Sequence, residues 1–134
     1  MKRIFRQILS VTAVLGIIVM LLAGCGGGSG AVYHTISPAD AKAKMDSGAA
    51  YILVDVRTAE EYQAQRIGGA INIPVDQIQT LAASMLPDKN ALIFTYCRSG
   101  VRSSNAAHTL VSLGYTNVYD MGGILNWPYD TVSG

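Results

Sequence analysis

Two continuous apolar runs, residues 51–56 and 91–96, constrain the fold of this chain more than any other feature. Apolar residues stand at nearly every position of both runs, without the alternation of a half-exposed strand. Such runs are typical of parallel strands that are buried on both faces of a sheet. The single charged residue within them, Asp55, lies near the end of the first run. We therefore expect two buried strands of a parallel sheet, with helices covering both faces.

The segments around these runs alternate between strand and helix signals. Ser37 followed by Pro38 is typical of a helix start, and Gly114 is typical of the residue after a helix end. Thr58 and Glu61 match a capping box that opens a short helix. Further strands are expected over residues 32–36, 70–74 and 118–121, and further helices over residues 38–45, 78–85 and 103–113, with a closing helical turn around Trp127. The alternation predicts a small α/β domain over residues 32–134, with a mostly parallel sheet flanked by helices.

The beginning of the chain differs in composition from the rest. Lys2, Arg3 and Arg6 precede an almost wholly apolar run over residues 8–22, and two small residues follow it. This order is typical of a secretory signal peptide, which we expect over residues 1–24. The alternative is an uncleaved membrane anchor, because the apolar run is only slightly shorter than a membrane-spanning helix. Both interpretations attach the remaining chain to a membrane, outside the cytoplasm.

Cys25 stands directly after these small residues. The sequence Leu-Ala-Gly-Cys at residues 22–25 resembles a bacterial lipobox, in which the cysteine is lipidated and becomes the mature N-terminus. Glycine and serine follow, so residues 25–31 are expected to be a lipidated cysteine and a flexible tether. We therefore expect a lipoprotein anchored at the extracytoplasmic face of the cell envelope, with a monomer as the default state.

The charge of the chain makes some classes of partner unexpected. The formal charge of the whole sequence is +1, but three of its ten basic residues belong to the predicted signal peptide. The remaining seven basic residues against nine acidic ones leave a formal charge of −2. This balance gives no reason to expect nucleic acid or an anionic bilayer surface as a partner. His34 and His108 are far from a metal-ligand spacing, so a metal site is not expected.

Cys97 follows the second apolar run and carries the clearest chemical signal. Lipidation of Cys25 would leave Cys97 without a disulfide partner, and an unpaired cysteine in an exported protein suggests a reactive thiol. Arg98, Gly100 and Arg102 come next, and a helix begins after them. Backbone N–H groups that converge at a helix N-terminus, together with arginines, favour a thiolate and attract an anion. The sequence therefore predicts a nucleophilic cysteine beside a site for an anion.

The residues at the two strand ends also fit simpler, structural roles. A cysteine at the end of a buried strand is often only a small structural hydrophobe. Because the polar residues Arg98 and Ser99 follow, we instead expect the Cys97 thiol at the rim of the domain. Asp55 and Arg57 fit a structural ion pair that shapes the floor of a cleft. Ligands bind beyond the carboxyl ends of the strands in such sheets, so Asp55 and Cys97 are expected at one site.

Four blocks of the sequence carry a family resemblance. They are Leu-Val-Asp-Val-Arg at 53–57 with Glu-Glu-Tyr at 60–62, Ile-Gly-Gly-Ala-Ile-Asn-Ile-Pro at 67–74, Tyr-Cys-Arg-Ser-Gly-Val-Arg-Ser at 96–103, and Gly-Tyr-Thr-Asn-Val-Tyr at 114–119 with Gly122, Gly123 and Trp127. Each block alone is weakly specific, but four in this order are highly specific. From residue 33 to residue 127 the chain resembles a single-domain rhodanese, which implies the rhodanese-like α/β fold.

The resemblance implies a sulfurtransferase that works without a cofactor. Cys97 would take the outer sulfur of a donor such as thiosulfate and become a persulfide, and a thiol or cyanide would then accept that sulfur, with ping-pong kinetics. The donor anion would be held by the loop after the cysteine, mainly through backbone N–H groups. The residues of this loop are Arg98, Ser99, Gly100, Val101 and Arg102. Ser103 is expected either to donate a hydrogen bond to the anion or to begin the helix.

Other functions occur on a similar fold. Cysteine phosphatases carry an arginine six residues after the cysteine, whereas Arg102 stands five residues after Cys97, which favours sulfur transfer. A non-enzymatic binding module, or a dedicated persulfide carrier for a protein partner, stays an alternative. The family often has Gly-His-Ile-Pro-Gly-Ala where residues 65–70 read Gln-Arg-Ile-Gly-Gly-Ala. Arg66 is therefore expected to face either the solvent or the site.

Overall fold

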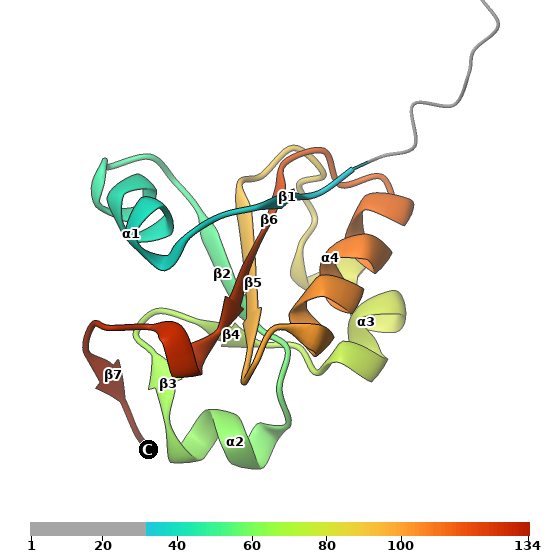
Figure 1. Cartoon of the computed structure of the whole chain (residues 1–134). Helices are drawn as coiled ribbons and strands as arrows, with labels where there is room; N and C mark the ends of the chain where they lie inside the picture. The colour runs from blue at the N-terminus through green and yellow to red at the C-terminus, as the bar shows by residue number, and fades with distance from the viewer. Residues whose placement is uncertain (1–31) are drawn as a thin grey trace, which may run out of the picture.

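The computed structural model describes residues 32–134, which are built around a five-stranded parallel sheet (Figure 1). The strand order is β1-β6-β5-β2-β4. These strands are β1 (His34–Thr35), β2 (Ile52–Asp55), β4 (Ile71–Asn72), β5 (Ile93–Cys97) and β6 (Val118–Gly123). The predicted signal peptide, Cys25 and the tether lie outside the described residues. Within residues 32–134, no helix is long and apolar enough to cross a membrane.

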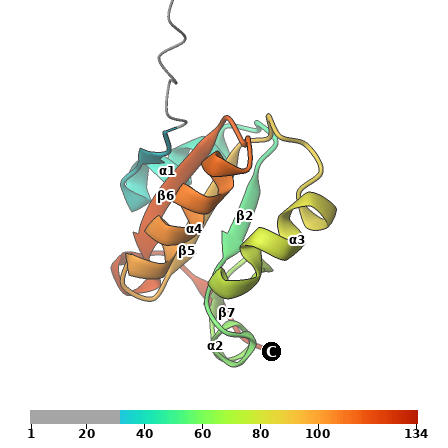
Figure 2. The same ribbon diagram turned by 90° about the vertical axis from the view of Figure 1, so that its right-hand side faces the viewer.

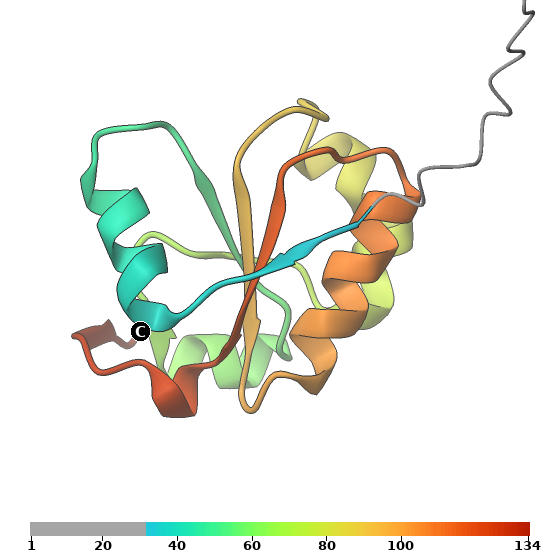
Figure 3. The same cartoon turned by 45° about the horizontal axis from the view of Figure 1, so that its top comes forward.

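Helices cover both faces of this sheet. They are α1 (Pro38–Asp46), α2 (Ala59–Ala64), α3 (Ile78–Met85) and α4 (Val101–Ser112), with the 3₁₀ turns η1 (Val75–Gln77) and η2 (Ile124–Asn126). α1 lies on one face and α3 and α4 lie on the other, while α2 lies near the edge where β2 and β5 end (Figures 1 and 3). Figure 2 shows α3 and α4 side by side on their face of the sheet. The predicted α/β domain with a mostly parallel, helix-flanked sheet is confirmed.

Two apolar clusters, one on each face of the sheet, form the core. β5 contributes Ile93 and Cys97 to the cluster beneath α3 and α4, and Phe94 and Tyr96 to the cluster beneath α1. Successive side chains of a strand point to opposite faces, and every residue of β5 is buried. Burial on both faces explains why this part of the sequence is a continuous apolar run.

The helix ends follow the local signals of the sequence. Ser37 caps α1, because its Oγ accepts a hydrogen bond from the Asp40 N–H at 3.1 Å. Thr58 and Glu61 form both hydrogen bonds of the capping box of α2. Gly114 follows the end of α4 with a φ of +97°, a left-handed conformation that glycine adopts without strain. These three predictions are confirmed.

A small second sheet was not predicted. β3 (Arg66–Ile67) pairs antiparallel with β7 (Thr131–Val132), which fastens the end of the described chain to the segment after α2. Arg66 Nη1 donates hydrogen bonds to the Gly134 carbonyl at 2.7 Å and to the Tyr62 carbonyl at 3.3 Å. The Arg66 side chain therefore holds the C-terminal segment, a role that its departure from the family pattern did not suggest.

Candidate active site

The carboxyl ends of β2 and β5 lie side by side at one edge of the sheet. Asp55, the last residue of β2, is in register with Tyr96, and Cys97 ends β5 one residue later. In Figure 1 the connection from β5 to α4 turns sharply at this edge, above α2. Asp55 and Cys97 share the edge as expected, but their side chains point to opposite faces of the sheet. Asp55 alternates with Val54, which packs in the same cluster as Cys97.

The fully buried carboxylate of Asp55 is bound to Arg57. Its oxygens accept hydrogen bonds from Arg57 Nε at 3.0 and 3.1 Å, from Nη2 at 2.6 Å and from the backbone N–H at 2.9 Å. Arg57 Nη2 also donates to the Gln65 carbonyl at 2.5 Å. Asn72 Nδ2 donates to the carbonyl oxygens of both Asp55 and Arg57. The ion pair thus joins β2 to the end of α2, while Asn72 of β4 holds the backbone beside it, and sequence reasoning missed Gln65 and Asn72.

The Cys97 side chain lies beneath the loop that follows it and is 1% exposed. The Gly100 N–H donates a hydrogen bond to Cys97 Sγ at 3.0 Å, and Ser103 Oγ lies 3.6 Å from the same sulfur. Gly100 has a φ of +114°, a left-handed conformation that reverses the loop, and α4 begins at the next residue. The thiol is therefore buried under its own loop, whereas the sequence placed it at the rim.

The surroundings of the Cys97 sulfur favour its ionised form. Burial raises the pKa of the thiol, but the hydrogen bond between Sγ and the Ser103 hydroxyl and those from the N–H groups of Ser103, Gly100 and Ser99 lower it more. The net result is a pKa below the ordinary value of a cysteine. Hydrogen bonds to the charged form stabilise it relative to the neutral form. This loop therefore prepares a thiolate, as the sequence predicted.

We expect the rate of sulfur uptake to follow the ionisation of Cys97 with a midpoint below that of a free cysteine, which is about 8.5. The rate should rise with pH and level off once the thiolate is fully formed. Ultraviolet absorbance of the thiolate, with Cys97→Ser as the blank, measures the same midpoint. Ser103→Ala should move it upward, because the hydroxyl is the strongest of the lowering contacts. A midpoint above 8.5 would contradict this description.

The lowered pKa of Cys97 also makes the free energy of unfolding depend on pH in a defined direction. The pKa of Cys97 is lower in the folded chain than in the unfolded chain, so the folded state binds fewer protons near this value. The resulting stabilisation is fully present above the unfolded pKa and is lost as the pH falls through the folded pKa. The free energy of unfolding should therefore decline over that range by more in the wild type than in Cys97→Ser.

The two arginines of the loop have different surroundings. Arg102 forms a two-pronged ion pair with Glu61 of α2, with Nη1–Oε2 at 2.7 Å and Nη2–Oε1 at 3.0 Å. The Arg102 guanidinium is the main cause that lowers the pKa of Glu61 to about 2. Arg98 is exposed, and its side chain has no hydrogen bond or ion pair among residues 32–134. The sequence indicated both charges but not the pairing of Arg102 with Glu61, which lies 41 residues away.

The loop rests on the end of β6. Gly123 is in register with Cys97, and a Cβ atom at Gly123 would lie 2.1 Å from the Arg98 carbonyl oxygen and 2.7 Å from Ser99 Cα. Leu125 N–H donates to the same Arg98 oxygen at 3.3 Å. The backbone of the loop thus approaches β6 so closely that only glycine fits between them. This contact gives a structural reason for the second glycine of the Gly122-Gly123 pair.

Gly123→Ala is expected to displace the cysteine loop. The added methyl group meets backbone atoms that cannot rotate away, and we expect a loss of about 1–3 kcal/mol in unfolding free energy. Sulfur uptake should fall at least as strongly as stability, because the N–H groups around Sγ move with the loop. Gly68→Ala is the matched control, since its Cβ would meet only Val132 Cγ1 at 3.9 Å. Equal stability and uptake in both variants would contradict the prediction.

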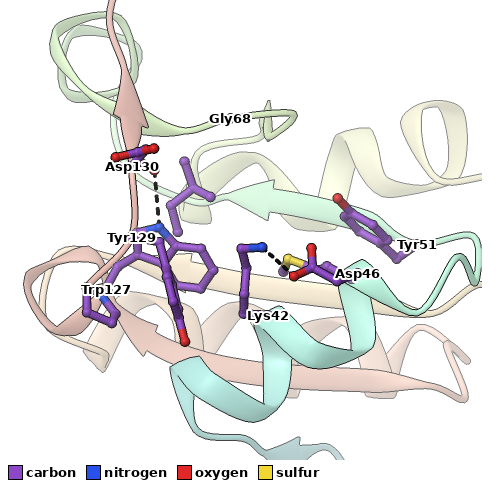
Figure 4. Close-up of a pocket in the computed structure, with 10 residues that line it drawn as sticks. Lys42, Asp46, Tyr51, Gly68, Trp127, Tyr129 and Asp130 are labelled. Atoms are coloured by element: carbon purple, nitrogen blue, oxygen red, sulfur yellow. Dashed lines mark hydrogen bonds and ion pairs between the residues drawn. The ribbon is translucent and has the colours of Figure 1, made fainter.

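Two pockets on the surface of residues 32–134 lie away from Cys97. One, of about 510 Å³, lies between α1 and the segment that follows η2. Figure 4 shows Lys42 and Asp46 of α1 in contact there, with Trp127 and Tyr129 beside them. The other, of about 560 Å³, lies where β2 and β5 begin, at the opposite edge from the cysteine. We place the site at Cys97 because the donors and the nucleophile meet there. Among residues 32–134, no three His, Cys, Asp or Glu residues are grouped to hold a metal ion.

Comparison with known families gives a match to the rhodanese-like domain over residues 37–129. Among curated proteins, the chain is similar to the thiosulfate sulfurtransferase PspE of Escherichia coli, with 38% identity over 81 residues, or 60% of this chain and 78% of PspE. It is also similar to the adenylyltransferase and sulfurtransferase UBA4 of Candida albicans, with 35% identity over 105 residues. That match spans 73% of this chain but only 24% of UBA4, so it concerns one part of a longer protein.

Solved structures agree with this match. A rhodanese with anions from E. coli superposes with a TM-score of 0.60 at 38% identity, covering 63% of this chain and all of that one. A rhodanese-related protein from Thermoplasma volcanium superposes with a TM-score of 0.64 at 30% identity, covering 75% of this chain and 98% of that one. The fold and the order of the sequence blocks therefore point to the same family.

Proposed function

Because the chain belongs to the rhodanese-like domain family, we propose that it is a sulfurtransferase that carries sulfane sulfur on Cys97. The observation that supports this most directly is the hydrogen bond from the Gly100 N–H to Sγ at the start of α4. Backbone donors that already face the sulfur stabilise negative charge there without rearrangement. Similarity to PspE, which is named a thiosulfate sulfurtransferase, favours thiosulfate as the donor.

The proposed reaction has two displacement steps. The Cys97 thiolate attacks the outer sulfur of thiosulfate, a new S–S bond forms, and the bond to the sulfonate sulfur breaks, so sulfite leaves with the electron pair. A thiolate or cyanide acceptor then attacks the outer sulfur of the persulfide. The bond to Sγ breaks and Cys97 returns to the thiolate. No net oxidation or reduction occurs, and covalent catalysis of this kind gives ping-pong kinetics.

Mass spectrometry of the full chain after treatment with thiosulfate tests the proposal. We expect a mass gain of one sulfur atom, located on the proteolytic peptide that contains Cys97, and its loss on addition of cyanide. No gain with thiosulfate or any other sulfane donor would overturn the proposal and favour a non-enzymatic binding module. Uptake of sulfur without release to cyanide or small thiols would favour a dedicated persulfide carrier.

Arg102 is proposed to attract the donor anion, although its positive charge is partly neutralised by the ion pair with Glu61. Arg102→Ala should raise the KM for thiosulfate several-fold and change stability by only about 0.2–1 kcal/mol, because its ion pair is partly exposed. Glu61→Gln leaves the guanidinium in place without its partner charge, so it should lower the same KM. Steady-state kinetics of both variants measure this contrast. An unchanged KM in Arg102→Ala, with a large loss of stability, would assign the arginine a purely structural role.

We also propose that residues 1–24 are a lipoprotein signal peptide and that lipid on Cys25 anchors the domain at the extracytoplasmic face of the cell envelope. The support is the sequence Leu-Ala-Gly-Cys and the glycine-rich stretch that follows it. Labelling of cells with a fatty-acid probe, followed by fractionation, tests this. Cys25→Ala should abolish the label and either release the protein or leave the precursor unprocessed, and unchanged labelling would refute the assignment.

A further inference from the structure

Two large apolar side chains are exposed on the segments that enclose Cys97. Val101, the first residue of α4, is 70% exposed, and Leu125 of η2 is 64% exposed. Their backbones belong to segments in contact, because the Leu125 N–H donates to the Arg98 carbonyl at 3.3 Å within the cysteine loop. We refer to Val101 and Leu125 as the apolar pair. It stands beside a sulfur that is 1% exposed.

Packing of the domain does not explain why the two residues of the apolar pair are apolar. Burying a side chain of this size stabilises a protein by about 1.5–3 kcal/mol relative to leaving it in water, and these two remain in water. A β-branched valine is also a poor residue for the first turn of a helix. Single exposed apolar residues are common, but two on touching segments beside a reactive group form a surface that a ligand can cover.

The charged side chains of the cysteine loop restrict the class of ligand that can cover this surface. Arg98, the exposed arginine of the same loop, has no charged or hydrogen-bonding partner among the residues described here. The charge of Arg102 is balanced by Glu61. Among residues 32–134, the segments around Cys97 therefore combine one arginine without an acidic partner and two exposed apolar side chains. A small anion such as cyanide has no apolar surface to place against them, whereas a peptide segment has both apolar and acidic groups.

On the basis of the proposed function, we infer that the apolar pair docks a polypeptide acceptor that presents a cysteine between apolar and acidic residues. The cysteine side chain of the acceptor is slender enough to approach the outer sulfur of a persulfide on Cys97. The acceptor thiolate forms an S–S bond with this outer sulfur, and the bond to Sγ breaks. Cys97 keeps the electron pair as a thiolate and the acceptor leaves as a persulfide, without any change in overall oxidation state.

The test separates sulfur uptake from sulfur release. The full chain is first treated with thiosulfate, freed of excess donor and checked for the added sulfur by mass. Release is then timed with three acceptors: cyanide, a synthetic peptide with one cysteine between leucine and valine and an aspartate at each end, and the same peptide with serine in place of leucine and valine. We expect release to the apolar peptide to be about fivefold faster than to the serine peptide.

Leu125→Gln is the decisive variant, and Met85→Gln is its matched control. Met85 is another exposed apolar side chain, 40% exposed, and it lies on α3 away from the cysteine loop. Leu125→Gln should remove the advantage of the apolar peptide, while sulfur uptake and release to cyanide change by less than twofold. Met85→Gln should behave as the wild type in all three reactions.

The outcomes distinguish the docking surface from the proposed function. Failure of the wild type to take up sulfur overturns the sulfurtransferase proposal and the docking inference together. Normal uptake with equal release to both peptides overturns the docking inference alone. An equal loss of cyanide and peptide reactions in Leu125→Gln would also overturn it, because Leu125 would then act by supporting the loop.

Discussion

Replacing Cys97 by serine is expected to abolish sulfur transfer while leaving the fold intact. Serine is a far weaker nucleophile at neutral pH, and removal of an enzyme's nucleophile lowers turnover by roughly 10³-fold or more. The fold should tolerate the change, because the serine hydroxyl can accept the hydrogen bond that Gly100 now donates to Sγ. We expect a loss of about 1–3 kcal/mol in unfolding free energy, because the change buries a hydroxyl in place of the thiol.

Turnover of thiosulfate with cyanide, together with thermal unfolding of the same samples, measures both parts of this prediction. Cys25→Ala is the matched control, since it removes the other cysteine of the sequence and should leave turnover of the purified protein unchanged. Residual transfer in Cys97→Ser that disappears in the double variant would move the sulfur-carrying role to Cys25. A large loss of stability in Cys97→Ser would instead mean that the thiol mainly fills the core.

The local parts of the fold were predictable from sequence because their signals are local. Residues 78–85 were predicted as a helix and form α3 with the same bounds. Ser37 and the capping box at Thr58 act on N–H groups only three residues away, so their patterns could be recognised without knowledge of the tertiary structure. The buried strands were recognisable for a different reason: burial on both faces requires a continuous apolar run, and this chain has two.

The parts that were missed depend on contacts between distant segments. β3 and β7 have two residues each and pair residues 66–67 with residues 131–132, so neither has a periodic pattern of its own. The burial of Cys97 likewise requires the loop to lie against β6, far along the chain. The Gly122-Gly123 pair was the available signal, because a glycine with no local turn pattern suggests close approach of another backbone.

The sequence predicted the type of chemistry at the site better than it predicted which side chains contact one another there. A cysteine between a buried strand and a helix start indicated a stabilised thiolate, and the pKa of Cys97 is indeed lowered by the loop N–H groups. The partner of Arg102 was not predictable, because Glu61 is 41 residues away and already had a local explanation in the capping box. The Glu61 carboxylate takes part in the capping box and in the ion pair, because its Oε2 also accepts a hydrogen bond from the Thr58 N–H at 3.1 Å.

Asp55→Ala is expected to cause the largest loss of stability of any single change proposed for this domain. Asp55 and Arg57 have side chains that are 0% and 5% exposed, so removal of the carboxylate leaves a guanidinium buried without its counter-charge. Breaking a buried ion pair in this way costs about 3–5 kcal/mol. Small domains are stable by only about 5–15 kcal/mol in total, so the variant should be close to unfolding at moderate temperature.

Denaturant unfolding of Asp55→Ala, Arg57→Leu and the double variant separates the charge effect from simple loss of packing. The double variant buries no unpaired charge, so it should be more stable than Asp55→Ala even though it lacks both native side chains. It should not reach the wild type, because the carbonyl oxygen of Gln65 loses the hydrogen bond from Arg57 Nη2. A double variant that is less stable than either single variant would show that the pair does not act as one unit. A loss below about 1 kcal/mol in Asp55→Ala would mean that water reaches the guanidinium, in which case the edge of β2 beside the cysteine loop is more open than its burial implies.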